Sequence, residues 1–336
     1  MGTTRADFRF LLNKRTFAMA EFVDNLPDEA KLVADKAKIK SADQAILTPT
    51  AHLLLQESSP HDIYVLKSSA AKVVAKESIK VSDLLDLPYC MKWARLSFGC
   101  EALDKCTQGG IATRGITEIC GVAGSGKTQL LLQLSLMSQL PLEFGGLGAG
   151  VAFICTEHTF PSKRLHELSK TFTQKYPSIN INYLAQVHVQ QIHNSEQLLK
   201  CCAEHLPPLM ASERIRLIII DSVAAVFRTY SDFIQRARDM RKLANCLLNL
   251  GDRYNCAVIC VNQVTSISKK QSEVPCLGLA WSHLGRTRLR ISKVPKQIKY
   301  DDKLLTVRKL EIIYSPETPI AYAEFLITGE GIVNVP

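Results

Sequence analysis

A glycine-rich stretch near the middle of the chain has the spacing of a phosphate-binding loop. Within GVAGSGKTQ, Gly121 is followed after four residues by Gly126, Lys127 and Thr128. In such a loop the backbone N–H groups surround nucleotide phosphates, the lysine contacts the β- and γ-phosphates, and the threonine hydroxyl binds Mg²⁺. The sequence therefore predicts a nucleotide site with Mg²⁺, built on Gly121, Gly124, Ser125, Gly126, Lys127, Thr128 and Gln129.

Three polar side chains stand where other apolar, strand-like runs end. The runs LIIID, AFICTE and VICVNQ finish at Asp221, Glu157 and Gln263. Ligands of open α/β sheets bind beyond the carboxyl ends of the strands, so these side chains are expected near the phosphate loop. Asp221 would complete the Mg²⁺ shell opposite Thr128, Glu157 would orient or deprotonate an attacking water, and Gln263 would sense the γ-phosphate.

Each of these three residues also has a purely structural interpretation. Asp221 can cap the helix that follows its strand, Glu157 can begin a helix, and Gln263 can serve as a hydrogen-bonding residue of the fold. The presence of the phosphate loop favours the nucleotide interpretation for Asp221.

The elements around the loop must hold these residues at one edge of a sheet. GITEIC (115–120) predicts a short buried strand before the loop, and TQLLLQLSLMSQL (128–140) predicts an amphipathic helix after it. Continuously apolar runs at 150–158, 215–222 and 256–264 are typical of buried parallel strands. Alternating patterns in TRLRISKV and VRKLEIIYS indicate antiparallel additions near the end of the chain. The predicted fold is an α/β core with a mostly parallel sheet flanked by helices.

Ahead of this core the sequence predicts a small helical domain. Residues 1–24 look loosely ordered, and 25–87 contain short helical segments for which Ser41 and Ser59 provide N-caps. This domain has the size of a helix-hairpin module that binds nucleic acid or protein. Residues 88–98 then form a linker and leading strand, and the sequence places the nucleotide-binding core at residues 99–336.

Composition places the chain among ordinary globular proteins. Its 336 residues are 46% hydrophobic and 22% charged. No apolar run approaches the roughly 20 residues that cross a bilayer, and the basic N-terminus lacks the apolar core of a secretory signal. The eleven cysteines are scattered, mostly in apolar runs, without metal-ligand spacing. We expect a soluble, intracellular protein with reduced cysteines. The basic N-terminus is also compatible with a mitochondrial presequence, which is the alternative.

The positive charge is concentrated in one stretch of the chain. Of the formal net charge of +9, residues 265–309 contribute eleven basic against three acidic residues, a surplus of 11 − 3 = 8. A concentrated basic surface is typical of proteins that bind a phosphate backbone, and a solvated charged rim is the alternative. The basic residues are Lys269, Lys270, Arg286, Arg288, Arg290, Lys293, Lys296, Lys299, Lys303, Arg308 and Lys309.

Six motifs in this order resemble the RecA-type recombinase family over about residues 95–335. They are LSFGCEALDKCTQGGI, GITEICGVAGSGKTQLLLQL, ICTEHTFPSKRL, LIIIDSVAAVFR, VICVNQV and LGLAWSHLGRTRLRISK. Within that family the chain is most similar to the eukaryotic strand-exchange recombinases and their paralogues. The resemblance implies a RecA-like ATPase core with ATP and Mg²⁺ as cofactors.

The resemblance also assigns roles to single residues. It implies that Lys127, Glu157 and Gln263 act on the nucleotide, that Thr128 and Asp221 hold the metal, and that Arg164 stacks on adenine. Segments 228–238 and 265–281 match the two loops that line the DNA channel in the family. The DNA-binding residues implied in and beside these loops are Arg228, Arg236, Lys269, Lys270 and Arg286.

Two departures from the recombinase pattern favour a paralogue that works in a complex. Segment 228–238 contains no glycine, although the first DNA loop of the recombinases does. Tyr314 stands where the recombinases carry an acidic residue in the segment that caps a neighbour's ATP. FAMA (17–20) has the Phe-x-x-Ala form of a family docking motif, but it precedes the helical domain and is interpreted as chance helix sequence.

The predicted function is that of an ATP-binding mediator in homologous-recombination DNA repair and meiotic recombination. Implied partners are single-stranded or branched DNA, other paralogue subunits and the main strand-exchange recombinase, in a nuclear hetero-oligomer without membrane contact. Whether the chain is an enzyme stays open, with weak DNA-dependent ATPase activity as the expectation. The alternatives are an autonomous DNA-stimulated ATPase or strand-exchange recombinase, and a structural subunit whose ATP site stabilises an interface.

Overall fold

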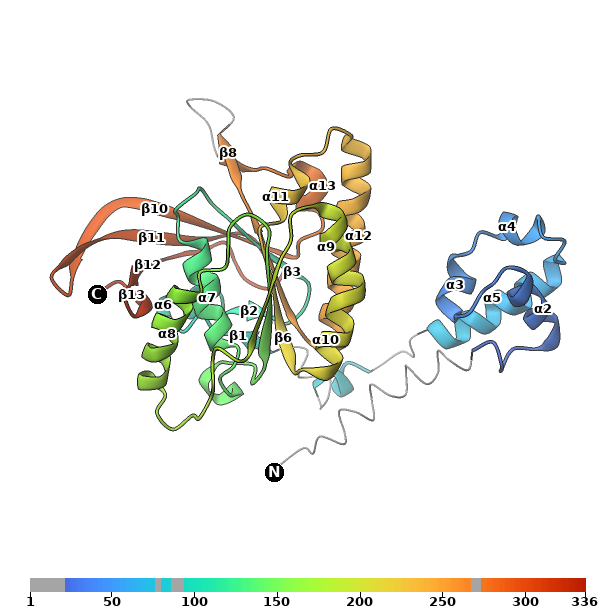
Figure 1. Cartoon of the computed structure of the whole chain (residues 1–336), viewed down its shortest axis with the longest axis horizontal. Helices are drawn as coiled ribbons and strands as arrows, with labels where there is room; N and C mark the ends of the chain where they lie inside the picture. Colours follow the sequence, from blue (N-terminus) through green and yellow to red (C-terminus); the bar gives the residue numbers. More distant parts are fainter. Residues whose placement is uncertain (1–21, 76–79, 86–93, 267–272) are drawn as a thin grey trace. The chain divides into compact units, whose positions relative to one another are not determined.

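The computed structural model describes residues 22–75, 80–85, 94–266 and 273–336 (Figure 1). It divides the chain into two compact units, with the boundary between Val81 and Ser82. The sequence places the end of the helical domain at residue 87, a few residues further along. Each unit has its own apolar core.

The N-terminal unit is helical. Its helices are α2 (Asp28–Lys36), α3 (Ala42–Leu47), α4 (Thr50–Leu54) and α5 (Pro60–Val74). The predicted N-caps are confirmed, because Ser41 Oγ accepts from the Gln44 N–H and Ser59 Oγ accepts from the Asp62 N–H.

The start of this unit departs from the prediction in one detail. Phe22 is buried in the same apolar cluster as Leu26 and Val33, so the expectation of a loosely ordered segment is wrong at this residue. Burial of a large aromatic ring holds the chain there. Residues 1–21, including the FAMA sequence, lie outside the described residues.

The second unit is built on a nine-stranded sheet in the order β13-β12-β11-β10-β3-β7-β6-β4-β5. Strands β10, β3, β7, β6, β4 and β5 are mutually parallel, whereas β10 to β13 pair antiparallel, which confirms a mostly parallel sheet. The strands are β3 (Ile116–Cys120), β4 (Gly150–Cys155), β5 (Val187–Gln191), β6 (Ile215–Asp221), β7 (Ala257–Asn262), β10 (Thr287–Tyr300), β11 (Lys303–Tyr314), β12 (Tyr322–Thr328) and β13 (Gly331–Asn334).

Strand β10 corrects the prediction that the last strands are all antiparallel additions. It pairs parallel with β3 over Thr287–Arg290 before it pairs antiparallel with β11. The Arg286 N–H bonds to the Ile116 carbonyl, so the chain re-enters the sheet at the start of β3 and runs in the same direction. The alternation in TRLRISKV lies in the inner half of β10, where Leu289 and Ile291 are buried in the core and the residues between them are not.

Helices cover both faces of the sheet (Figure 1). Helices α7 (Lys127–Met137) and α8 (Ser162–Lys175) lie on one face, and α9 (Ser195–Lys200), α10 (Leu206–Ser212), α12 (Phe233–Tyr254) and α13 (Gly278–Ser282) lie on the other. Alternate strand residues divide between the two cores, as Phe153 and Ile154 of β4 illustrate.

Helix α7 differs from the amphipathic helix that was predicted. Every residue from Leu130 to Met137 is buried, including Gln133 and Ser135. The Gln133 amide donates to the Phe98 carbonyl and accepts from the Ile332 N–H, so its polar group is satisfied inside the core. The helix after the phosphate loop is therefore enclosed and held firmly.

The remaining elements are short. They are η1 (Ser82–Leu85), β1 (Arg95–Leu96), α6 (Glu101–Cys106), β2 (Ile111–Ala112), η3 (Leu142–Phe144), η4 (Cys201–His205), α11 (Val223–Phe227), β8 (Val264–Ser266) and β9 (Glu273–Pro275). The described cysteines are free thiols, and burial raises the pKa of Cys155 to about 12 and that of Cys201 to about 11. Within the described ranges, no helix is long and apolar enough to cross a membrane.

Candidate functional site

The phosphate loop joins the end of β3 to the start of α7, as the sequence predicts. Gly126 caps α7 with φ of +112°, and a Cβ there would also collide with the Ile327 side chain. A Cβ on Gly121 would collide with the Ile291 carbonyl of β10. Both positions therefore require glycine, and the last strands of the sheet form one wall of the loop.

Lys127 lies at the N-terminus of α7 and folds back on the loop. Its Nζ donates to the carbonyls of Gly121 (2.7 Å) and Val122 (2.9 Å). Burial lowers its pKa, while the carboxylates of Asp221 and Glu157 act in the opposite direction. A partly desolvated ammonium beside a row of helix N–H groups is suited to bind phosphate.

Thr128, in the first turn of α7, meets Asp221, at the end of β6. The Thr128 hydroxyl donates to Asp221 Oδ2 at 3.0 Å, and Asp221 is the last residue of β6. Burial raises the pKa of Asp221, against the lowering effects of the Thr128 hydrogen bond and the Lys127 charge.

A hydroxyl and a carboxylate are hard oxygen ligands of the kind Mg²⁺ takes together with phosphate oxygens and water. Over the described ranges, no group of three or more His, Cys, Asp or Glu side chains could hold a metal alone. The donor set at Thr128 and Asp221 thus fits a metal that arrives with a nucleotide.

Glu157 and Gln263 are in direct contact. Gln263 Nε2 donates to both Glu157 oxygens, at 2.6 and 2.8 Å, and Gln263 Oε1 accepts from Arg228 Nη1 at 3.1 Å. The structure therefore brings together a predicted water-activating acid, a predicted sensor and a predicted DNA-binding residue. In this arrangement both oxygens of Glu157 are engaged by an amide.

Arg164 lies on α8 and is held by the turn between β12 and β13. Its guanidinium donates to the Thr328 and Gly329 carbonyls at 2.7 and 2.8 Å, and its Nε donates to Gln129 Oε1 at 2.9 Å. Because Gln129 follows Thr128 on α7, the predicted adenine-stacking residue lies beside the helix that begins at the phosphate loop.

The predicted DNA-binding residues do not all lie together. Arg228 contacts Gln263 at the carboxyl end of the sheet, and Arg236 lies over the Phe233 ring with 5.0 Å between guanidinium and ring centre. Arg286 is at the opposite end, beside the first residue of β3, and it pairs with Glu317. Lys269 and Lys270 lie outside the described residues.

The count of charges in the sequence overstates the basic surface of residues 265–309. Six of the described basic residues pair with carboxylates, and most of those carboxylates lie outside the counted stretch. The pairs are Arg286 with Glu317, Arg288 with Glu118, Arg290 and Lys309 with Glu311, Lys296 with Glu324, and Lys299 with Asp302.

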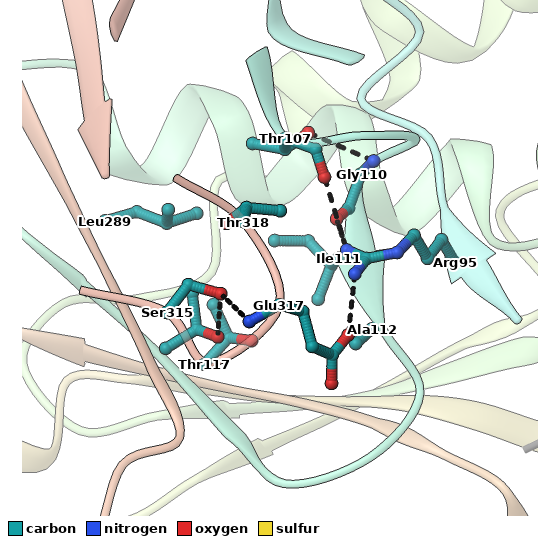
Figure 2. Close-up of a pocket in the computed structure, with 11 residues that line it drawn as sticks. Arg95, Thr107, Gly110, Ile111, Ala112, Thr117, Leu289, Ser315, Glu317 and Thr318 are labelled. Atoms are coloured by element: carbon teal, nitrogen blue, oxygen red, sulfur yellow. Dashed lines mark hydrogen bonds and ion pairs between the residues drawn. The ribbon is translucent and has the colours of Figure 1, made fainter. Parts of the chain in front are cut away.

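The largest of these ion clusters centres on Glu317 and was not predicted. Its carboxylate accepts from Arg95 at 2.6 Å, from Arg114 at 2.8 Å and from Arg286 at 2.9 Å. Figure 2 shows Arg95 between Glu317 and the carbonyls of Thr107 and Gly110, to which it also donates. The only advance signal was one acid between two prolines in SPETP, in a stretch otherwise poor in acids.

Two further residues near the nucleotide site were missed. Glu118 is fully buried in β3 and pairs with Arg288, and an acid inside an apolar run was a usable signal for a buried partner. Arg308 of β11 donates to the Ser125 carbonyl in the phosphate loop at 3.0 Å. No sequence signal could have found that contact, because it depends on the return of β11 past the loop.

Comparison with known proteins agrees with this architecture. The family profile Rad51 matches residues 91–335. The DNA repair protein XRCC3 homolog of Arabidopsis thaliana is 35% identical over 284 residues, which cover 72% of this chain and 93% of that protein. The DNA repair protein XRCC3 of Bos taurus is 34% identical, covering 74% of this chain and 77% of that protein.

A more distant relative comes from fission yeast. The DNA repair protein rhp57 of Schizosaccharomyces pombe is 29% identical, covering 71% of this chain and 79% of that protein. The predicted RecA-like fold is confirmed. Within the paralogues, the motifs favoured the X-ray-repair cross-complementing member, and the two nearer relatives bear this out.

Proposed function

Because the chain belongs to the Rad51 family and is an XRCC3-like paralogue with a role in homologous-recombination DNA repair, we propose that it is an ATP-binding mediator of that process. The observation that carries this proposal is the convergence of Lys127, Thr128 and Asp221 on one phosphate loop. The proposal makes three claims that experiments can test, namely that this chain binds ATP, DNA and partner proteins.

The proposed nucleotide site uses residues from four elements. The loop N–H groups and Lys127 would bind the phosphates, Thr128 and Asp221 would hold Mg²⁺, and Arg164 would lie against the base. Bound Mg²⁺ would supply charge neutralisation at the phosphates. Lys127 must exchange its bonds to the Gly121 and Val122 carbonyls for phosphate contacts, so the loop changes its internal bonding on binding.

We expect ATP hydrolysis to be slow. Glu157 would act as the general base, but both its oxygens accept from Gln263. A carboxylate with engaged lone pairs is a poor proton acceptor until that amide moves away. Nucleotide that draws Gln263 towards the γ-phosphate would free Glu157, and DNA contact with Arg228 would act on the same amide.

The proposed partners are single-stranded or branched DNA, other paralogue subunits and the main strand-exchange recombinase. Arg228 and Arg236 would contact phosphate, and the exposed Phe233 ring beside Arg236 offers a surface for base stacking. We place the chain in a nuclear hetero-oligomer, with meiotic recombination as a second setting.

The substitution Lys127→Ala tests whether the proposed mediator function depends on ATP. We expect loss of binding to a fluorescent ATP analogue with Mg²⁺ and loss of repair in complemented cells, because the phosphate charge is left without its cation. Lys105→Ala is the matched control, since Lys105 forms an exposed pair with Glu101 away from the loop. Full complementation by Lys127→Ala would contradict ATP dependence.

An autonomous recombinase is the main alternative. Negative-stain electron microscopy of the chain with single-stranded DNA and a non-hydrolysable ATP analogue separates the two. Continuous helical filaments that disappear in Lys127→Ala would identify a recombinase, whereas isolated particles support a mediator that needs a partner. Segment 228–238, which has no glycine, favours the mediator. DNA binding that is absent or insensitive to salt would instead favour a structural subunit.

A further inference from the structure

Glu118 is a fully buried carboxylate that the proposed nucleotide chemistry does not use. It lies in β3, two residues before the strand ends at the phosphate loop, and its side chain has 0% exposure. Buried charges are costly unless they are paired and hydrogen-bonded. Its two partners come from the strands on either side of β3, which are β7 and β10.

The first partner holds the chain where it leaves the sheet. Asn262, also fully buried, donates from Nδ2 to Glu118 Oε1 at 2.7 Å. It is the last residue of β7 and directly precedes Gln263. From Gln263 the chain makes an excursion, residues 263–286, before it re-enters the sheet as β10. The structure describes residues 263–266 and 273–286 of this excursion.

The second partner holds the chain where it returns. Arg288 Nε donates to Glu118 Oε2 at 2.7 Å, and its guanidinium lies 5.1 Å from the ring centre of Tyr314. The Tyr314 hydroxyl lies 2.8 Å from the Ser282 carbonyl and 3.2 Å from the Gly285 carbonyl, to which it donates. Glu118 is thereby linked to the last residues of the excursion.

Two polar atoms of this network are left without a partner. Arg288 Nη2 and Asn262 Oδ1 are buried and have no hydrogen-bond partner among the described residues. One is a donor and the other an acceptor, and both belong to side chains that bind the same carboxylate. The network therefore keeps one spare donor and one spare acceptor, which can take up new partners when the neighbouring strands shift.

We infer that Glu118 is a positioning residue that ties both ends of excursion 263–286 to the strand feeding the phosphate loop. Nucleotide binding therefore changes the excursion through this carboxylate as well as through Gln263. The inference rests on the proposed nucleotide site, and it assigns a task to a residue outside that site.

Glu118→Gln is the test variant, because it keeps the size of the side chain. A glutamine can still accept from Arg288, so the fold is expected to survive. Its Nε2 is a donor and replaces the acceptor that Asn262 Nδ2 uses, so the tie to the end that leaves the sheet is weakened. Glu311→Gln is the matched control, since it breaks the Arg290–Glu311 pair (2.6 Å) between β10 and β11 without touching Glu118. Tyr314→Phe is the second variant and removes only the hydroxyl that binds the returning end.

The readout is amide hydrogen exchange of the full chain, alone or with co-purifying subunits, with and without a Mg²⁺-bound non-hydrolysable ATP analogue. We expect the analogue to slow exchange in 273–286 about tenfold in wild type and Glu311→Gln, a typical coupling. Glu118→Gln should bind the analogue yet show less than about twofold slowing there. Tyr314→Phe should lose the effect only near residues 282–286.

The outcomes separate this inference from the proposed function. Wild-type chain that fails to bind the analogue overturns the proposed function and the inference with it. Binding without slowed exchange in wild type, or equal slowing in Glu118→Gln and wild type, overturns the inference alone. A lower melting temperature of Glu118→Gln with the nucleotide effect intact would show that Glu118 only stabilises the fold.

Discussion

Glu118 and Glu317 both pair with arginine, but they differ in burial and in the number of arginines around them. Glu118 is fully buried and has one arginine, Arg288, with an amide as its other partner. Glu317 is 21% exposed and has three arginines around it. The buried carboxylate depends on a single cation, whereas Glu317 has three cations and is partly open to solvent. Burial, and not the number of ion pairs, should therefore decide which carboxylate matters more for stability.

The strongest test of this comparison is Arg288→Met. The methionine keeps the apolar stem against Tyr314 but leaves Glu118 as an unpaired buried charge. We expect a loss of about 3–5 kcal/mol in the free energy of unfolding. Urea unfolding followed by tryptophan fluorescence measures it. A variant as stable as wild type would contradict the comparison, because a buried carboxylate that loses its cation should be costly.

Glu317→Gln should have a smaller effect. The substitution removes the carboxylate that pairs with three arginines, but the partial exposure lets solvent compensate their charges. We expect a loss of about 1–2 kcal/mol, and less in high salt. Arg286→Gln serves as the control because two arginines remain on Glu317, and it should cost under about 1 kcal/mol. A larger loss for Arg286→Gln than for Glu317→Gln would reverse the comparison.

The smallest expected effect is the contribution of the Glu317 cluster to the loss of stability at acid pH. Burial raises the pKa of Glu317, but the hydrogen bonds and charges of Arg114, Arg286 and Arg95 outweigh it, and the net shift is downward. A lowered folded-state pKa gives stability that is present above the unfolded value, about 4.3, and lost as the pH falls below it. The pH dependence of unfolding below about pH 4.3 should be shallower in Glu317→Gln. Identical slopes would mean that other acids cause the acid sensitivity.

The sequence alone predicted those features of the fold and the site that depend on residues close together in the chain. The phosphate loop could be located because its glycines, lysine and threonine are close together in the sequence. Asp221, Glu157 and Gln263 could be assigned to the same sheet edge because each of them ends an apolar run. The structure brings these side chains together at one sheet edge. Their roles stay predictions until nucleotide binding is measured.

What could not be predicted depends on contacts between distant segments. The pairing of Arg286 with Glu317 removes a basic residue from the expected DNA surface, and it requires the chain to return beside β3. Strand β5 was missed because VHVQQ is half-exposed at the sheet edge and has no continuous apolar run. Helix α7 was misjudged because the enclosure of Gln133 depends on Phe98 and Ile332.

The β10–β11 hairpin has features that oppose edge-to-edge aggregation between copies of this chain. Its outer half extends past β3 and β12, so its backbone edges have no further strand in the sheet (Figure 1). Pro295 lacks an N–H, a register shift interrupts the pairing between Lys293 and Gln297, and lysines 296, 299 and 303 add charge. Such features prevent an open edge from recruiting strands of other molecules. The hairpin can therefore project into solvent without seeding aggregation.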